Sequence, residues 1–162
     1  MGLIVVIGLG VDQATKAWAV AGLTPGHPVP LVGDILQLSL YRNPGAAFST
    51  GASLTVVFAL AGVAALIGLG GWVVPRVRSR LWAVTIGLGL AGIAGNLIDR
   101  LTRSPGLLRG HVVDFVALKY FAVFNVADVM LTSAAVLVLI ILFFVKVGFD
   151  GRVLTNGPTK AD

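Results

Sequence analysis

The sequence lacks cysteine and glutamate altogether, and charged residues of every kind make up only 12% of its 162 positions. Without cysteine the chain can form neither a disulfide nor a cysteine-bound zinc site, and it has no thiol nucleophile. Soluble domains carry about 25% charged residues, whereas this chain is 57% hydrophobic and has a mean hydropathy of +0.96. The composition therefore predicts a single domain, residues 1–162, that resides in a membrane.

Four apolar segments are each long enough to cross a bilayer, which takes about 20 helical residues. They run approximately over residues 3–23, 54–74, 81–101 and 121–147. A cleavable signal peptide is a second interpretation of the first segment, because Ala19-Val20-Ala21 imitates a small-residue cleavage site. A signal peptide has basic residues before an uninterrupted apolar core, however, and here Asp12 and Lys16 interrupt the core itself. We therefore expect four transmembrane helices.

Basic residues give this topology an orientation. Four spans put both termini on one side, and the connection between the second and third spans on that side holds Arg76, Arg78 and Arg80. Because cytoplasmic loops are enriched in Lys and Arg, we expect both termini in the cytoplasm. The net charge of +5 would suggest nucleic acid in a soluble protein, but these basic residues sit mainly in loops. Topology and anionic lipid headgroups account for them, so we expect membrane lipid and no nucleic acid as a partner.

The connection between the first two spans is too long for a simple turn, and it contains a strand pattern. Leu36, Leu38 and Leu40 alternate with polar side chains, a period of two that predicts a short strand with one apolar face. We expect residues 115–119 to be a strand or loop as well, because the residues around them favour extended structure. The predicted fold is an all-α polytopic membrane protein with four transmembrane helices and a small extracytoplasmic β element.

Polar side chains interrupt the apolar segments at helical spacings. Asp12 and Lys16 are one turn apart and can pair inside the membrane, which serves either helix packing or chemistry. Two further groups share a helix face in the same way: Asn96, Asp99 and Arg100 in the third segment, and Asn125 and Asp128 in the fourth. Because helix direction alternates, these side chains are expected in the outer half of the membrane, with Asp12 near the middle. The sequence thus predicts a polar pocket that opens outward.

Asp114 and Asp128 are candidates for a pair of carboxyls near the outer surface. Asp114 precedes the fourth segment, and Asp128 is expected about seven residues into it, roughly 10 Å deep. A continuous helix would separate the two by roughly 21 Å, so the chain between them must turn back if they are to meet. Two carboxyls in one partly desolvated site share a proton, as in aspartic peptidases. On spacing alone, a role in packing or in a proton relay remains an alternative.

Competing chemistries lack necessary parts. The two histidines, His27 and His111, lie in outer loops without the spacing of metal ligands, and there is no H-E-x-x-H motif. The chain also lacks the G-x-S-x-G motif of serine hydrolases and the glycine-rich phosphate-binding loop of nucleotide-dependent enzymes. We therefore expect neither a metal nor a cofactor.

Five short motifs occur in an order and at spacings that resemble those of the lipoprotein signal peptidases, the signal peptidase II family of intramembrane aspartic peptidases. They are DQATK at 12–16, RNPGAAF at 42–48, GIAGNLIDR at 92–100, VVDF at 112–115 and FNVAD at 124–128. Each motif alone would be a weak signal. Their common order over residues 3–144 makes the resemblance specific.

The resemblance implies a function and a set of site residues. Asp114 and Asp128 would be the catalytic pair of an aspartic endopeptidase in the bacterial cytoplasmic membrane, with the active site near the outer face. The residues that would line or support the pocket are Asp12, Lys16, Asn43, Gly45, Gly92, Asn96, Asp99, Arg100 and Asn125. The substrate would be a prolipoprotein with a diacylglyceryl-modified cysteine, cut on the N-terminal side of that cysteine. Globomycin-like cyclic peptides would inhibit the enzyme by occupying the carboxyl pair.

Two functions from other classes remain as alternatives. One is a small proton-coupled carrier that uses Asp12, Asp99 and Asp128 as a relay, which a flux measurement in proteoliposomes would support. The other is a non-catalytic assembly factor, for which replacing Asp114 by Asn would leave function intact.

Overall fold

The computed structural model describes residues 1–45 and 53–154 of the chain. It contains four helices long and apolar enough to cross a membrane, which confirms the predicted number of spans. The helices are α1 (Gly2–Gly22), α2 (Ser53–Gly68), α3 (Arg80–Thr102) and α4 (Val126–Ile140). Helix α2 continues into the π-helix η1 (Leu69–Val73) and the short 3₁₀ helix η2 (Val74–Arg76), and α4 continues into the π-helix η3 (Ile141–Val145).

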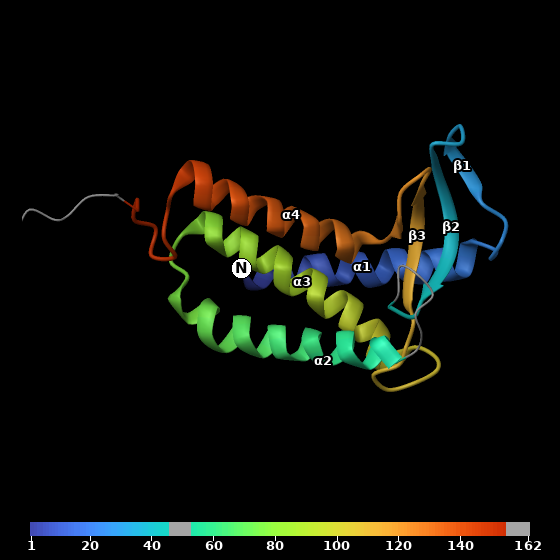
Figure 1. Ribbon diagram of the computed structural model, residues 1–162, viewed down its shortest axis with the longest axis horizontal. Coiled ribbons are helices and arrows are strands. Elements are labelled where there is room, and N and C mark those ends of the chain that lie inside the picture. The colour runs from blue at the N-terminus through green and yellow to red at the C-terminus, as the bar shows by residue number, and fades with distance from the viewer. Residues whose placement is uncertain (46–52, 155–162) are drawn as a thin grey trace, which may run out of the picture.

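The four helices alternate in direction and form a bundle with a small sheet standing across one end (Figure 1). Helix α3 packs against each of the other three helices. At the end away from the sheet, Met1 and Phe149 both pack against the cluster around Trp82 and Ile141. The first residue of the chain and the last part of its described segment therefore lie at the same end of the bundle.

The sheet has four antiparallel strands in the order β1-β2-β3-β4. They are β1 (Val29–Val32), β2 (Leu36–Asn43), β3 (Val112–Leu118) and β4 (Val123–Phe124). The strand predicted around Leu36 to Leu40 is the first part of β2. Of the segment 115–119, predicted to be a strand or loop, residues 115–118 form the second half of β3, and Lys119 lies in the turn that follows. Strand β1 was not predicted, because it contains Pro30 and proline is rare in strands. However, β1 lies at the edge of the sheet, where proline is tolerated.

The fourth span begins at Val126 and not at Phe121, so the prediction was wrong by five residues. Apolar composition continues through this stretch, but Val123 and Phe124 pair with β3 as strand β4 and cannot be helical. Asp128 is consequently the third residue of α4, not one about seven residues inside it. The carboxyl lies in the first turn of the helix, at the end of the bundle where the sheet stands.

Small residues on α3 let the helices approach closely. A Cβ atom on Gly87 would lie 3.2 Å from the side chain of Ile4, and one on Gly95 would lie 2.5 Å from a carboxylate oxygen of Asp12. Ala91, between them, is fully buried. This close contact brings the polar residues of α1 against those of α3.

Candidate active site

Asp128 is held by the way helix α4 begins. Asn125 is the N-cap, and its side-chain oxygen accepts a hydrogen bond from the backbone N–H of Asp128 at 3.1 Å. The Asp128 carboxylate in turn accepts one from the backbone N–H of Asn125, also at 3.1 Å. This reciprocal capping box satisfies two backbone donors that the first turn leaves open, and the helix dipole favours a negative charge there. The sequence Asn-Val-Ala-Asp thus fixes one carboxyl at the helix N-terminus.

Asp114 approaches from the sheet. It lies in β3 opposite Tyr41 of β2 and is only 2% exposed. One carboxylate oxygen accepts a hydrogen bond from Asn43 at 2.9 Å, and the other accepts one from Asn125 at 2.5 Å. The pKa of Asp114 is raised to about 6, chiefly because burial disfavours the charged form. The Asn43 hydrogen bond opposes this rise, and the negative charge of Asp128 adds to it.

Two asparagines connect the carboxyls. The side-chain amide of Asn125 donates both to Asp114 and, at 3.2 Å, to the amide oxygen of Asn96. Asn96 donates to the Asp128 carboxylate at 2.8 Å and accepts a hydrogen bond from Lys16 at 3.0 Å. No direct hydrogen bond joins Asp114 to Asp128 within the described part of the chain, and Asn125 contacts both. The chain between the two aspartates does turn back, through strand β4, as their separation in sequence required.

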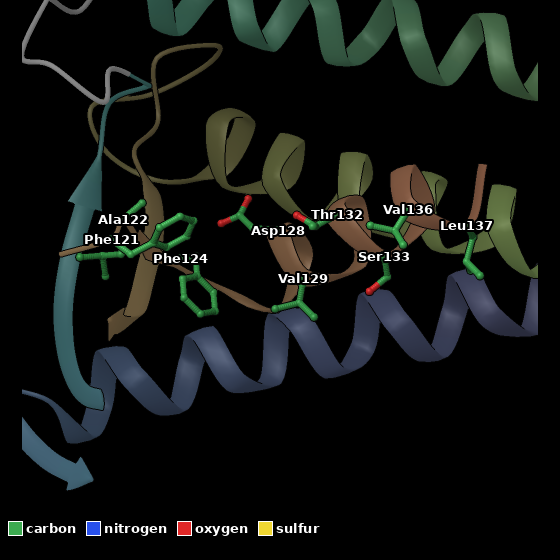
Figure 2. Close-up of a pocket in the computed structure, with 10 residues that line it drawn as sticks. Phe121, Ala122, Phe124, Asp128, Val129, Thr132, Ser133, Val136 and Leu137 are labelled. Atoms are coloured by element: carbon green, nitrogen blue, oxygen red, sulfur yellow. The ribbon is translucent and has the colours of Figure 1, made fainter. Parts of the chain in front are cut away.

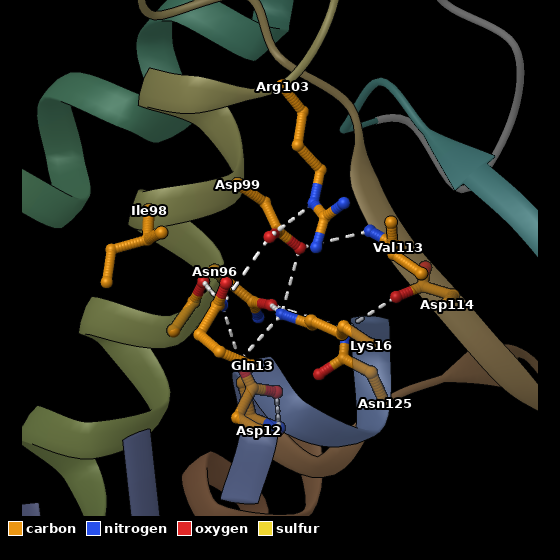
Figure 3. Close-up of polar contacts among 12 residues, drawn as sticks. Asp12, Gln13, Lys16, Asn96, Ile98, Asp99, Arg103, Val113, Asp114 and Asn125 are labelled. Carbon is orange, nitrogen blue, oxygen red and sulfur yellow. Dashed lines mark hydrogen bonds and ion pairs between the residues drawn. The ribbon is translucent and has the colours of Figure 1, made fainter. Parts of the chain in front are cut away.

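A buried network of ion pairs lies beside the carboxyls (Figure 3). The ammonium of Lys16 is 3.0 Å from both Asp12 and Asp99, and all three side chains are fully buried. Together with Asn96, these carboxylates supply one acceptor for each of the three Lys16 donors. The predicted pairing of Asp12 with Lys16 is confirmed. The addition of Asp99 makes the pair a network that joins α1 to α3.

Two members of the network were missed by sequence reasoning. Arg103 donates to Asp99 at 2.7 Å, and Gln13 donates to Asp12 at 3.0 Å and to the backbone oxygen of Gly95 at 3.1 Å. Arg103 stands four residues after Asp99, the same spacing that identified Asp12 and Lys16. That spacing could have found it. Gln13 carries no comparable signal, because it neighbours Asp12 in sequence and its partners are on another helix.

The predicted glycines brace the site without contacting the carboxyls. Gly45 has a φ of +102°, and its backbone N–H donates to the side chain of Asn43 at 2.8 Å, which orients the amide toward Asp114. A Cβ on Gly92 would lie 2.6 Å from the backbone oxygen of Ala127, so only glycine fits where α3 meets the start of α4. Residues 46–48, the remainder of the RNPGAAF motif, lie outside the described residues.

Arg100 contacts the backbone of Asn96, whereas Lys16 contacts its side chain. Its guanidinium donates to the backbone oxygen of Asn96 at 3.1 Å and lies over the ring of Phe58, 5.9 Å from the centroid. Its Nε atom is buried without a hydrogen-bond partner among the described residues. Arg100, Asn96 and Phe58 line a cavity of about 180 Å³ between α2, α3 and α4. A fixed positive charge therefore lies beside the polar network.

An apolar groove of about 750 Å³ leads to Asp128 (Figure 2). It follows α4 from Phe121, before the helix begins, to Leu137, and Asp128 lies near the end closest to the sheet. Its lining is otherwise apolar apart from the hydroxyls of Thr132 and Ser133: Phe121, Ala122, Val123, Phe124, Val129, Val136 and Leu137. The groove can hold a long apolar group with one end at a carboxyl. No group of three or more His, Cys, Asp or Glu suited to a metal ion occurs within residues 1–45 and 53–154.

Comparison with known proteins gives one consistent match. A family model described as signal peptidase (SPase) II matches residues 4–144. The lipoprotein signal peptidase of Leifsonia xyli is 46% identical over 142 residues, which are 87% of this chain and 65% of that protein. That of Rhodococcus jostii is 46% identical over 143 residues, 88% of this chain and 71% of that protein. That of Mycobacterium avium is 44% identical over 142 residues, 88% of this chain and 76% of that protein.

Solved structures of bacterial membrane enzymes are similar to this chain in fold. A bacterial membrane enzyme determined by the in meso method at 1.9 Å resolution is similar with a TM-score of 0.73 and 29% identity. The similarity covers 88% of this chain and 91% of that one. A second such enzyme, determined at 2.3 Å resolution, has a TM-score of 0.68 at the same identity. The bundle and sheet are therefore the architecture of a known membrane enzyme.

Proposed function

The chain belongs to the signal peptidase II family, and on that premise we propose that it is an aspartic endopeptidase that removes signal peptides from prolipoproteins. Asp114 and Asp128 are its catalytic pair. The observation that carries this proposal is the contact of Asn125 with both carboxyls, one of which, Asp128, lines an apolar groove. The pair hydrolyses the peptide bond on the N-terminal side of a diacylglyceryl-modified cysteine.

The two carboxyls have complementary roles in the reaction. The ionised carboxylate takes a proton from water, whose oxygen attacks the scissile carbonyl carbon, while the protonated carboxyl donates to the carbonyl oxygen. The tetrahedral intermediate then collapses, the C–N bond breaks, and the amine leaves with a proton from the pair. Asp114 is the better candidate for the shared proton, because burial raises its pKa to about 6.

The charges around the pair support a single shared proton. Four carboxyls and three cations lie together: Asp12, Asp99, Asp114 and Asp128, with Lys16, Arg100 and Arg103. An unbalanced charge is expensive away from water, so the cluster is most stable when its net charge is zero. One proton on the pair of Asp114 and Asp128 gives that balance. The same proton is the one that the mechanism requires.

The groove along α4 receives the apolar part of the substrate from the lipid. Its lining is mostly apolar and includes Asp128 near the end closest to the sheet, so a chain lying in it brings the adjoining polar bond to the pair. Globomycin-like cyclic peptides inhibit by occupying the pair of Asp114 and Asp128. The enzyme lies in the bacterial cytoplasmic membrane with both termini in the cytoplasm, an orientation supported by Arg76, Arg78 and Arg80 at the end of the bundle away from the sheet. The pair then lies near the outer face.

The decisive experiment is cleavage of a purified prolipoprotein in detergent, with and without the diacylglyceryl group on its cysteine. We expect the wild-type protein to cut only the lipid-modified form. Asp114→Asn and Asp128→Asn should each lose activity by about 10³-fold or more, because each removes a partner of the proton transfer. Asp34→Asn is the matched control, since Asp34 is an exposed aspartate that, within the described residues, forms an ion pair with Lys119 at the edge of the sheet and none with the site. Appreciable turnover by a well-folded Asp114→Asn or Asp128→Asn variant would rule out the proposed pair.

A further inference from the structure

The Asp99 carboxylate is a junction between three parts of the chain (Figure 3). One oxygen accepts from Arg103 at 2.7 Å, and the other lies 3.0 Å from Lys16 and accepts the backbone N–H of Val113 at 3.1 Å. Asp99 is fully buried. The contacts join α3 to α1 through Lys16, to the start of the following loop through Arg103, and to β3 through Val113. Any change in the orientation of this carboxylate is therefore transmitted to the strand.

Val113 directly precedes Asp114 in β3. The bond from its N–H fixes the backbone where β3 passes over α3, and the side chain of Asp114 then extends to Asn43 and Asn125. A shift of the strand by a fraction of an ångström would lengthen both of these hydrogen bonds. The position of Asp114 thus depends on Asp99, although the two carboxyls make no contact with each other.

Arg103 is held so that it can keep Asp99 in place. It is the first residue after α3, and its side chain folds back over the last turn. The loop that follows is closed by backbone hydrogen bonds from Gly106 to Arg103, from Gly110 to Arg100 and from His111 to Ser104, and a further one joins Arg109 to Gly106. A Cβ on Gly110 would lie 2.2 Å from the backbone oxygen of Asp99, so this loop packs directly on the helix end. Only 22% of the Arg103 side chain is exposed.

The charge of Arg103 also decides how firmly Asp99 is held. Lys16 lies at the same distance, 3.0 Å, from Asp12 and from Asp99. Without Arg103, two buried carboxylates would share a single cation, and one of them would lack a full countercharge. With Arg103 present, Asp12 and Asp99 each have a cation of their own. The charge-assisted bond of 2.7 Å is the shortest of these contacts, as expected for a strong interaction.

From these contacts we propose that Arg103 is a positioning residue, which acts through Asp99 and the Val113 N–H to place Asp114 for catalysis. The inference rests on the proposed peptidase function for its effect on activity. Its structural part stands on the Asp99 contacts alone. Arg103 does not contact the reacting atoms. Its removal should therefore lower kcat more than it weakens substrate binding.

The test compares Arg103→Gln, Arg103→Lys and the control Arg109→Gln, which alters an exposed arginine of the same loop. In Arg103→Gln the amide of Val113 should exchange with deuterium about tenfold faster, and kcat should fall by about tenfold or more while KM changes less than about twofold, because a small misplacement affects chemistry most. Arg103→Lys keeps the charge and should recover part of kcat. Arg109→Gln should behave as the wild type.

Two results would overturn the proposal. One is unchanged Val113 exchange in Arg103→Gln, and the other is a fall in kcat that follows the melting temperature and is not relieved by Arg103→Lys. Failure of the proposed function is a different outcome, since the wild-type protein itself would then not cleave the lipidated substrate. In that case the exchange of the Val113 amide still decides whether Arg103 positions the strand.

Discussion

The carboxylate of Asp12 accepts a hydrogen bond from the backbone N–H of Ala127 at 2.9 Å, across 115 positions of sequence. Asp12 is in the middle of α1, and Ala127 is in the first turn of α4, directly before Asp128. The donor is one of the backbone groups that a helix start leaves without a partner, and a negative charge is favourable at this end of the helix dipole. The first transmembrane helix therefore stabilises the turn that holds a proposed catalytic carboxyl.

Asp12→Ala should lower the free energy of unfolding by about 3 kcal/mol, because it removes a buried ion-pair partner and the acceptor for Ala127. Activity should also fall, since the turn that carries Asp128 loses a support. The double variant with Lys16→Met tests the coupling, which we expect to be about 1 to 3 kcal/mol. Thermal unfolding in detergent measures it. If the two single effects simply add, the ion pair is not coupled.

Asn125 has two separable tasks, and Asn125→Ser distinguishes them. Serine is as good an N-cap as asparagine, so the variant should keep its stability to within about 1 kcal/mol. It has no amide to donate to both Asp114 and Asn96, however, so kcat should fall by about 10²-fold. Asn125→Ala should lose the cap as well and melt lower. Full activity in the serine variant would show that the link between the carboxyls is dispensable.

The buried Asp114 makes stability depend on pH. Its pKa of about 6 lies above the ordinary value, so the folded state prefers the protonated form. The favourable contribution is complete below about pH 4 and is lost as pH rises through about 6. The amide introduced by Asp114→Asn does not titrate. The stability of this variant relative to wild type should therefore increase between pH 4 and pH 7, by up to about 3 kcal/mol. A pH-independent difference would contradict the raised pKa.

Gly95 should tolerate no side chain, because a Cβ there would lie 2.5 Å from the Asp12 carboxylate and 3.2 Å from the Cβ of Ala127. Gly95→Ala should destabilise the protein by about 1 to 3 kcal/mol through overpacking. Gly89→Ala is the matched control on the same helix, where the new Cβ would lie at an ordinary 3.7 Å from Ala134. It should be neutral or stabilise by up to about 1 kcal/mol, as alanine favours helix. Equal melting temperatures for the two variants would exclude the close approach.

The sequence predicts those features that depend on length or on local spacing. Apolar length is enough to locate the four spans, and the spacing of four identifies Asp12 with Lys16, because neighbours on a helix face are set by helix geometry alone. Hydropathy cannot locate the start of α4, since Val123 and Phe124 are equally apolar in a strand and in a span. The capping pattern from Asn125 to Asp128 carries that information instead.

Contacts between distant segments could be predicted only in part. The pairing of Asp99 with Lys16 and the bond from Val113 depend on how α1, α3 and β3 meet, which no spacing along one element records. The role of Gln13 is of the same kind. Its side chain reaches the backbone oxygen of Gly95 across a close helix interface that a side chain at position 95 would widen.

Of the two proposed catalytic carboxyls, one is carried by the sheet and the other by a transmembrane helix. Asp114 reaches Asn125 only when β3 is paired with β2 and seated on α3, whereas Asp128 is in place as soon as α4 forms its first turn. A chain that has inserted its helices without closing the sheet therefore has only one of the two carboxyls in position. On the proposed mechanism, which needs both carboxyls, such a chain does not hydrolyse a peptide bond until the sheet has closed.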